Sequence, residues 1–252
     1  MTAVMITMRR DGEDVPFLVR AIPGKGLGCI AVRDIHLGER LISEVPLVMC
    51  GPSSLPVDKL VADLSAQDQE AFFSLSQNEV RFGQTKTADG IFATNALPSH
   101  HFSHTHDAVF TTISRFNHAC DNCACFKWNS TIGQLTVHAT RPIRKGAEIT
   151  LSYGFPTGCV LRHERRQRLR DAFGFHCICS KCELDGEALQ RSEARAVEIG
   201  DTSSFVNELC VWGSLPTLVC VDVSQVLSKV TVATSNRQLG VARIHSSHAD
   251  YA

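Results

Sequence analysis

Short apolar runs broken by glycine and proline characterise the first part of the chain. Residues 17–22 and 40–48 are rich in β-branched and other apolar side chains, and residues 23–28 between them contain proline and three glycines. Short strands bounded by such turn residues are typical of small antiparallel sheets. We therefore expect strands over 17–22 and 40–48, with a turn over 23–28.

The apolar spacing changes to a helical period in the next stretch. Between residues 58 and 75 the apolar positions recur three, four or seven residues apart, which places them on one face of a helix or of a helix pair. Ser65 lies inside this stretch and can cap a helix. The sequence predicts a helical insertion over about 53–97, with residues 91–96 forming the end of a core strand. The apolar positions are Leu60, Leu64, Ala71, Phe72 and Leu75.

The second half of the chain predicts a hairpin and two helices. Residues 125–128 and 134–140 flank a turn at 131–133, and residues 160–173 and 183–199 have few helix breakers. In the first helix we expect Leu161, Leu169, Ala172 and Phe173 to face inward and the arginines to face mostly outward. An arginine-rich face can bind nucleic acid, but a solvated surface is the expectation here. The arginines are Arg162, Arg165, Arg166, Arg168 and Arg170.

A short pattern occurs twice, 108 positions apart. In each copy an arginine, an isoleucine, a glycine and a larger aliphatic residue keep the same spacing, and each copy predicts a turn that leads into a strand. Ordinary turn chemistry would give the same pattern, so both interpretations stay open. The copies are Arg33, Ile35, Gly38 and Leu41, and Arg141, Ile143, Gly146 and Ile149.

Composition restricts the classes of protein that remain. The 252 residues include 44% hydrophobic and 20% charged residues, with a formal net charge of -1, which is typical of a globular protein without a strong field for nucleic acid or membrane. Its apolar runs are too short for a membrane span and its start does not resemble a signal peptide. With eleven cysteines, we expect a reducing compartment, the nucleus or cytoplasm.

Three closely spaced cysteines predict a metal site. Cys177, Cys179 and Cys182 form a Cys-x-Cys-x-x-Cys pattern, but a structural zinc ion needs four ligands. Cys120 is our candidate for the fourth, with Cys123 and Cys125 as rivals. The histidine tract at 100–106 has no neighbouring cysteine and is expected to be a solvated loop.

Four motifs in order resemble those of SET-domain protein lysine methyltransferases, in particular the zinc-bearing group that includes the SET-and-MYND proteins and their fungal relatives. The resemblance covers about residues 15–184, and the chain lacks the cysteines and histidines of a MYND finger. The motifs are the glycine motif at 24–28, Arg115-Phe-Asn-His-Ala-Cys120, Glu148-Ile-Thr-Leu-Ser-Tyr-Gly154, and the cysteine cluster, which resembles a post-SET zinc motif.

The resemblance implies an α+β fold, a β-rich SET fold of small antiparallel sheets with a helical insertion and a zinc-binding post-SET segment. It implies a SET domain over 15–155, a helix and post-SET zinc segment over 156–184, and a helical, then poorly defined tail over 185–252. For the tail beyond residue 200, a small appended element, a loosely ordered tail and a misread exon are all left open.

The resemblance also implies site roles. Tyr153 would be the catalytic residue, and Cys120, which holds the motif position, would join the other three cysteines in binding zinc. The expected substrate is a lysine of a histone tail or of another protein, and the expected state is a monomer. Residues expected to bind S-adenosylmethionine are Lys25, Gly26, Leu27, Gly28, Asn117, His118, Tyr153 and Phe175.

One departure from the family motif keeps a second interpretation open. The family commonly continues with Cys-x-Pro-Asn, whereas this chain has Cys120-Asp-Asn-Cys123. The missing proline loosens a turn beside the expected cofactor site. The alternative function is therefore a weakly active or inactive SET-fold module, stabilised by zinc, that binds other proteins.

Overall fold

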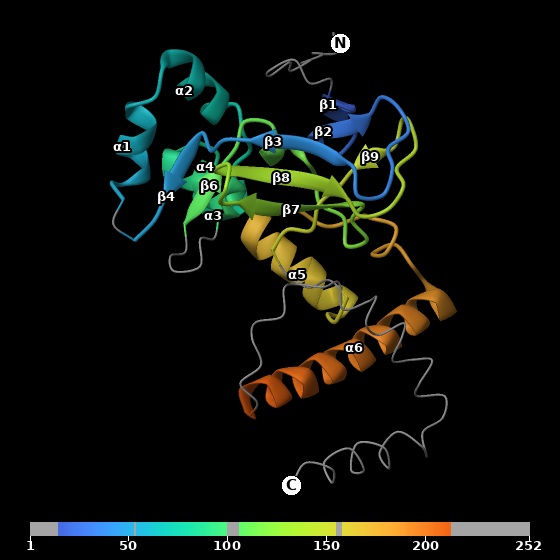
Figure 1. The fold of residues 1–252 in the computed structure, drawn as a ribbon. Helices are drawn as coiled ribbons and strands as arrows, with labels where there is room; N and C mark the ends of the chain where they lie inside the picture. The colour runs from blue at the N-terminus through green and yellow to red at the C-terminus, as the bar shows by residue number, and fades with distance from the viewer. Residues whose placement is uncertain (1–14, 53, 100–105, 155–157, 213–252) are drawn as a thin grey trace, which may run out of the picture. The chain divides into compact units, whose positions relative to one another are not determined.

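The computed structural model describes residues 15–52, 54–99, 106–154 and 158–212 (Figure 1). The chain divides into two units, residues 1–201 and 202–252, and the three sheets found in the described residues lie in the first unit. Most of the histidine tract and the predicted tail beyond 212 lie outside the described residues. No helix in the described part of the chain is long and apolar enough to cross a membrane.

The first sheet holds the glycine motif. It consists of β1 (Phe17–Ile22), β2 (Gly26–Ala31) and β9 (Glu148–Ile149), all antiparallel and in the order β1-β2-β9. The predicted turn over 23–28 is too long, because residues 26–28 already pair with β1. The turn closes where the amide of Lys25 donates a 3.0 Å hydrogen bond to the carbonyl of Ile22.

Two further sheets follow, and Figure 1 shows β3, β8 and β7 side by side. The second sheet has the order β3 (Arg40–Glu44), β8 (Gln134–Ala139), β7 (Ala124–Asn129), and the third β4 (Val48–Cys50), β6 (Asp107–Val109), β5 (Leu97–Pro98). The predicted hairpin of β7 and β8 is confirmed, since Asn129 pairs with Gln134.

The predicted single strand over 40–48 is wrong, because β3 and β4 belong to different sheets. Pro46 lies between them and has no amide hydrogen to donate to a ladder. The chain changes sheet at this point.

The repeated pattern is confirmed as two turns that each lead into a strand, and the two copies contact each other. Ile35 and Ile143 form an antiparallel bridge with hydrogen bonds of 2.8 and 3.0 Å. The amide of Gly38 donates to the carbonyl of Ala139, and the amide of Gly146 donates to the carbonyl of Ala31, both at 2.8 Å. Positive φ angles of 81° and 85° make glycine the residue suited to both turns. The two halves of the β core are therefore joined by matching turns.

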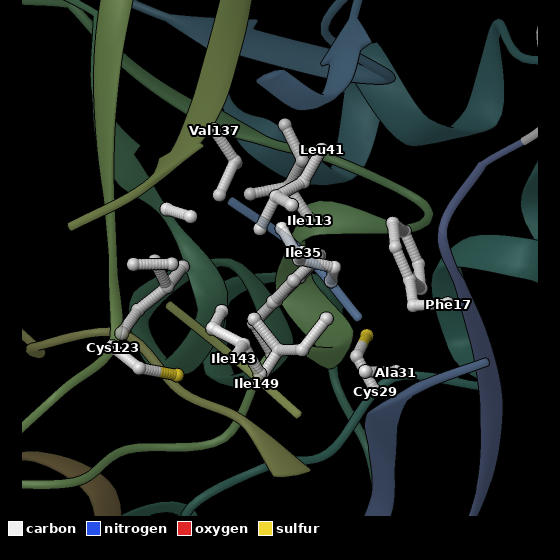
Figure 2. Close-up of a cluster of buried hydrophobic side chains, with 14 of the residues drawn as sticks. Phe17, Cys29, Ala31, Ile35, Leu41, Ile113, Cys123, Val137, Ile143 and Ile149 are labelled. Carbon is white, nitrogen blue, oxygen red and sulfur yellow. The ribbon is translucent and has the colours of Figure 1, made fainter. Parts of the chain in front are cut away.

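Figure 2 shows the core that these turns enclose, with Ile35, Ile143 and Ile149 pointing toward one another. Buried side chains from the first two sheets and from the 3-10 helix η1 (Ile113–Arg115) form one cluster. Burying one large apolar side chain contributes about 1.5–3 kcal/mol. The cluster therefore fixes the sheets that carry the motifs.

Four helices lie between β4 and β5. They are α1 (Val57–Ala62), α2 (Ala66–Phe73), α3 (Glu79–Phe82) and α4 (Ala88–Asn95). The predicted helix pair is confirmed, and Ser65 caps α2 by accepting a hydrogen bond from the amide of Asp68. The strand end predicted for 91–96 is wrong, because Thr87 caps α4 by accepting from Gly90 and residues 88–95 continue as helix.

The last two helices are α5 (Arg162–Phe173) and α6 (Gly186–Trp212), which begin two and three residues later than predicted. Leu169 is buried as expected, but Ala172 is exposed and Arg165 is only 1% exposed. The outward placement predicted for Arg165 is therefore wrong. Its guanidinium donates hydrogen bonds to the carbonyl of Val160 and to the sulfur of Cys182.

Candidate active site

A cavity of about 490 Å³ gathers the motifs that are far apart in the sequence. It is bounded by the β1–β2 turn, the Asn-His motif at 115–120, Tyr153 and the segment between α5 and the cysteine cluster. Ser74 and Asn95 of the insertion complete the lining. Every residue predicted to bind the cofactor lines this cavity except Gly28. The ones that do are Lys25, Gly26, Leu27, Asn117, His118, Tyr153 and Phe175.

Gly28 acts behind the cavity wall. A Cβ atom at this position would lie 2.5 Å from the side-chain nitrogen of Asn117 and 2.8 Å from the Cδ1 of Ile22. Only glycine leaves room for the Asn117 amide here. The glycine therefore lets a side chain, rather than a ligand, approach the backbone.

Glu148 joins two of the predicted cofactor residues. Its Oε2 lies 2.7 Å from the Nζ of Lys25, and its Oε1 accepts a 2.9 Å hydrogen bond from the Nδ2 of Asn117. Both carboxylate oxygens are thus occupied, and the ion pair is partly buried. The motif from Glu148 to Gly154 does not by itself predict a role for Glu148, which follows from its place on β9 next to β2.

Tyr153 lies at the centre of an aromatic group. Its hydroxyl donates a 2.8 Å hydrogen bond to the carbonyl of Phe116, and burial raises its pKa above the ordinary value. Its ring centroid lies 4.8 Å from that of Phe173, 5.3 Å from His118 and 6.3 Å from Phe175. The sequence placed Phe173 on the inner face of a helix but not at the site.

A second cavity of about 80 Å³ lies on another side of Tyr153. Phe116, Phe126 and Leu151 line it together with β5 residues. Tyr153 and Phe173 line both cavities, as do Ser114 and two residues at the end of α4. Tyr153 and Phe173 are therefore aromatic walls common to a large cavity of mixed polar and apolar lining and a small, mostly apolar one.

His118 connects the tyrosine to the cysteine cluster. Its Nδ1 accepts a 3.1 Å hydrogen bond from the backbone amide of Tyr153, so the proton of the neutral ring lies on Nε2. That Nε2 is 3.3 Å from the sulfur of Cys120. Burial lowers the pKa of His118 to about 4, which keeps the ring neutral at pH 7.

The four predicted cysteines meet as one buried cluster. Ligand atoms of Cys120, Cys177, Cys179 and Cys182 all lie within 4.8 Å of one another, and the sulfurs of Cys120 and Cys182 are 3.5 Å apart. A tetrahedral zinc ion with Zn–S bonds of about 2.3 Å has sulfurs about 3.8 Å apart. The donor set and its spacing fit a zinc ion.

The rival ligands lie elsewhere. The sulfur of Cys123 accepts a 3.3 Å hydrogen bond from the amide of Thr150, and Cys125 is exposed on β7. Among the described residues the candidate metal-binding group contains neither of them. In the altered motif, the side-chain amide of Asn122 donates a 2.8 Å hydrogen bond to the carbonyl of Ala124, which holds the turn without a proline.

Two arginines of α5 face this cluster rather than solvent. Arg166 donates to the carbonyls of Cys177 and Cys182 at 3.1 and 3.0 Å. Arg165 donates to the sulfur of Cys182. Arg162 also donates a 2.8 Å hydrogen bond to the carbonyl of Leu184. Three of the five arginines considered for a nucleic-acid face therefore bind the post-SET segment.

Comparison with known families agrees with this arrangement. The SET domain family matches residues 26–154, from the glycine motif to the residue after Tyr153. That segment is half of the chain, and it contains every strand of the three sheets except β1, together with the Asn-His motif. The chain belongs to the SET-domain family.

Several curated methyltransferases are similar in sequence. Histone-lysine N-methyltransferase set5 of Schizosaccharomyces pombe is 30% identical over 198 residues, covering 77% of this chain and 59% of that protein. Protein-lysine N-methyltransferase SMYD4 of Homo sapiens is 33% identical over 81 residues, covering 32% of this chain and 10% of that protein. The chain thus spans less than two thirds of the length of either relative.

Proposed function

We propose that this protein transfers a methyl group from S-adenosylmethionine to a lysine side chain of another protein. The observation that carries the proposal is that Tyr153 and Phe173 line both a large, partly polar cavity and a small, mostly apolar one. Methyl transfer needs a site for the donor and a separate route for the amine, which meet at one point. The two cavities supply such a division.

The large cavity suits the donor. When bound, S-adenosylmethionine supplies an electrophilic methyl group carried on a sulfonium. Asn117 and the ammonium of Lys25 would hold its amino-acid end, and Phe175 would pack on its adenine. Lys25 has three N–H donors, so it can serve a carboxylate while it stays paired with Glu148.

The small cavity suits an unprotonated lysine. A lysine amine has a reference pKa near 10.4, and apolar surroundings disfavour its charged form. Phe116, Phe126 and Leu151 provide such surroundings, and Tyr153 lines the same cavity. Once the amine has lost its proton, its lone pair can attack the methyl carbon as the carbon–sulfur bond breaks. Alignment of this kind contributes about 7–11 kcal/mol.

The cysteine cluster would support the site through zinc. Cys120, Cys177, Cys179 and Cys182 would bind one ion, which would fix the segment carrying Phe175 against the Asn-His motif. We also propose a division of the chain into three parts. These are a SET domain over 15–155, a post-SET zinc segment over 156–184 and a tail over 185–252. A histone or another protein would be the substrate of a monomeric enzyme in the nucleus or cytoplasm.

A titration of labelled S-adenosylmethionine into the purified protein, followed by transfer assays on histones and on a lysate of other proteins, tests the proposal. Saturable binding and label on lysine are the expected results. The alternative, an inactive interaction module, predicts neither donor binding nor transfer. Binding without transfer to any protein offered would contradict the proposed reaction, and the absence of both binding and transfer would favour the alternative.

A further inference from the structure

Arg165 is a buried charge without a carboxylate partner. Its residue is 1% exposed, and no salt bridge among the described residues includes it. One terminal nitrogen donates to the carbonyl of Val160, and the other lies 3.8 Å from the sulfur of Cys182. Its Nε is a buried nitrogen with no hydrogen-bond partner. With neutral partners alone, burying this guanidinium charge would lower the stability of the fold.

The cysteine cluster is the nearest source of compensating negative charge. Burying an unpaired charge costs several kcal/mol, so such groups are normally paired or bind metals. Four thiolates around one zinc ion carry a net charge of minus two, which is equally costly to bury alone. Arg165 and a zinc-bound thiolate cluster therefore each supply what the other lacks.

We infer that Arg165 is a positioning residue of the metal centre, whose charge, donated toward the sulfur of Cys182, stabilises the zinc-bound thiolates. The inference rests on the zinc site proposed above. It goes further by assigning to α5 a direct influence on zinc affinity. Groups that contact metal ligands in this way typically change metal affinity by about 10–100-fold when removed.

Arg166, the next residue along α5, provides a matched control. It also reaches the cluster, but it donates to the backbone carbonyls of Cys177 and Cys182 and to no sulfur. Its loss would loosen the loop without removing a hydrogen bond to a ligand atom. Comparing the two variants therefore distinguishes the effect of a charge beside a ligand sulfur from the effect of hydrogen bonds to the backbone.

The test compares zinc affinity, by competition with a chromogenic chelator, for the wild type and for Arg165→Met, Arg165→Lys and Arg166→Met. We expect Arg165→Met to weaken zinc binding by about tenfold or more, Arg165→Lys to recover much of the loss, and Arg166→Met to stay closer to the wild type. In the cobalt-substituted proteins, the thiolate-to-metal absorption band should shift in Arg165→Met and not in Arg166→Met.

Each outcome bears on a separate claim. Wild-type protein that holds no zinc would contradict the metal centre itself. Zinc held by Arg165→Met as tightly as by the wild type would overturn the role of Arg165 and leave the metal centre intact. Equal losses in Arg165→Met and Arg165→Lys would also overturn it, because shape rather than charge would then be responsible. If Arg165→Met does not fold, the test uses Arg165→Lys in its place. A zinc affinity and a cobalt absorption band identical to those of Arg166→Met would then overturn the role of Arg165.

Discussion

The side-chain amide of Asn117 donates a 2.9 Å hydrogen bond to the carboxylate of Glu148, which also binds Lys25. This carboxylate orients an amide and an ammonium group that both face the large cavity. Glu148 therefore fixes the orientation of two groups of the proposed donor site, although it does not line the cavity itself.

We predict that Glu148→Ala weakens S-adenosylmethionine binding by about tenfold, a loss of about 1.4 kcal/mol, because Asn117 and Lys25 lose their shared acceptor. Isothermal titration measures this. Glu39→Ala is the control, since it removes an ion pair with Arg33 and neither residue lines the cavity. Equal affinity for the wild type and Glu148→Ala would show that the network is not needed for binding.

Tyr153→Phe should cut methyl transfer by at least about tenfold, or about 1.4 kcal/mol of activation free energy, and leave donor affinity nearly unchanged. The change removes the hydroxyl but keeps the ring that packs on Phe173. The carbonyl of Phe116 loses its donor, which would lower stability by about 1 kcal/mol. Single-turnover rates and thermal unfolding measure the two effects. An undiminished rate would remove Tyr153 from the reaction.

Removing Cys120 should release zinc, whereas removing Cys123 should not. Cys120→Ser replaces one of four clustered sulfurs, but Cys123 instead accepts a hydrogen bond from Thr150. We expect Cys120→Ser, or treatment with a strong chelator, to abolish methyl transfer before the β core unfolds. Metal analysis and circular dichroism follow the two events. Zinc lost from Cys123→Ser and kept by Cys120→Ser would reverse the ligand assignment.

Gly174→Ala should destabilise the protein and reduce activity together. Gly174 ends α5 with a φ of 78°, and an added Cβ would lie 2.5 Å from the Oδ1 of Asn78. Asn78 also donates to the carbonyl of Asp171, so the insertion holds the segment that leads to Phe175. Backbone strain costs about 1 kcal/mol and the steric conflict adds to it.

Gly133→Ala is the matched control for Gly174→Ala. Gly133 has a φ of 65° and no atom within 4 Å of an added Cβ, so it carries the backbone strain alone. Chemical denaturation of both variants measures the difference. A Gly174→Ala variant no less stable than Gly133→Ala would show that Asn78 yields at no cost.

The sequence by itself determined the elements that depend on local chemistry. The turns at Gly38 and Gly146 follow from glycine's access to positive φ, and the cap at Ser65 follows from its hydroxyl. The cysteine spacing predicted three members of the cluster, and the family resemblance selected Cys120 over Cys123. Such features are set by residues a few positions apart.

Only the tertiary structure decided what distant residues do together. The pairing of Glu148 with Asn117 depends on β9 joining β2, and the pairing of Arg165 with Cys182 depends on how α5 packs behind the cluster. The sequence predicted Arg165 to face solvent because charged residues are rarely buried without a partner. That partner lies on another segment, and only packing brings a charge and its compensating sulfur together.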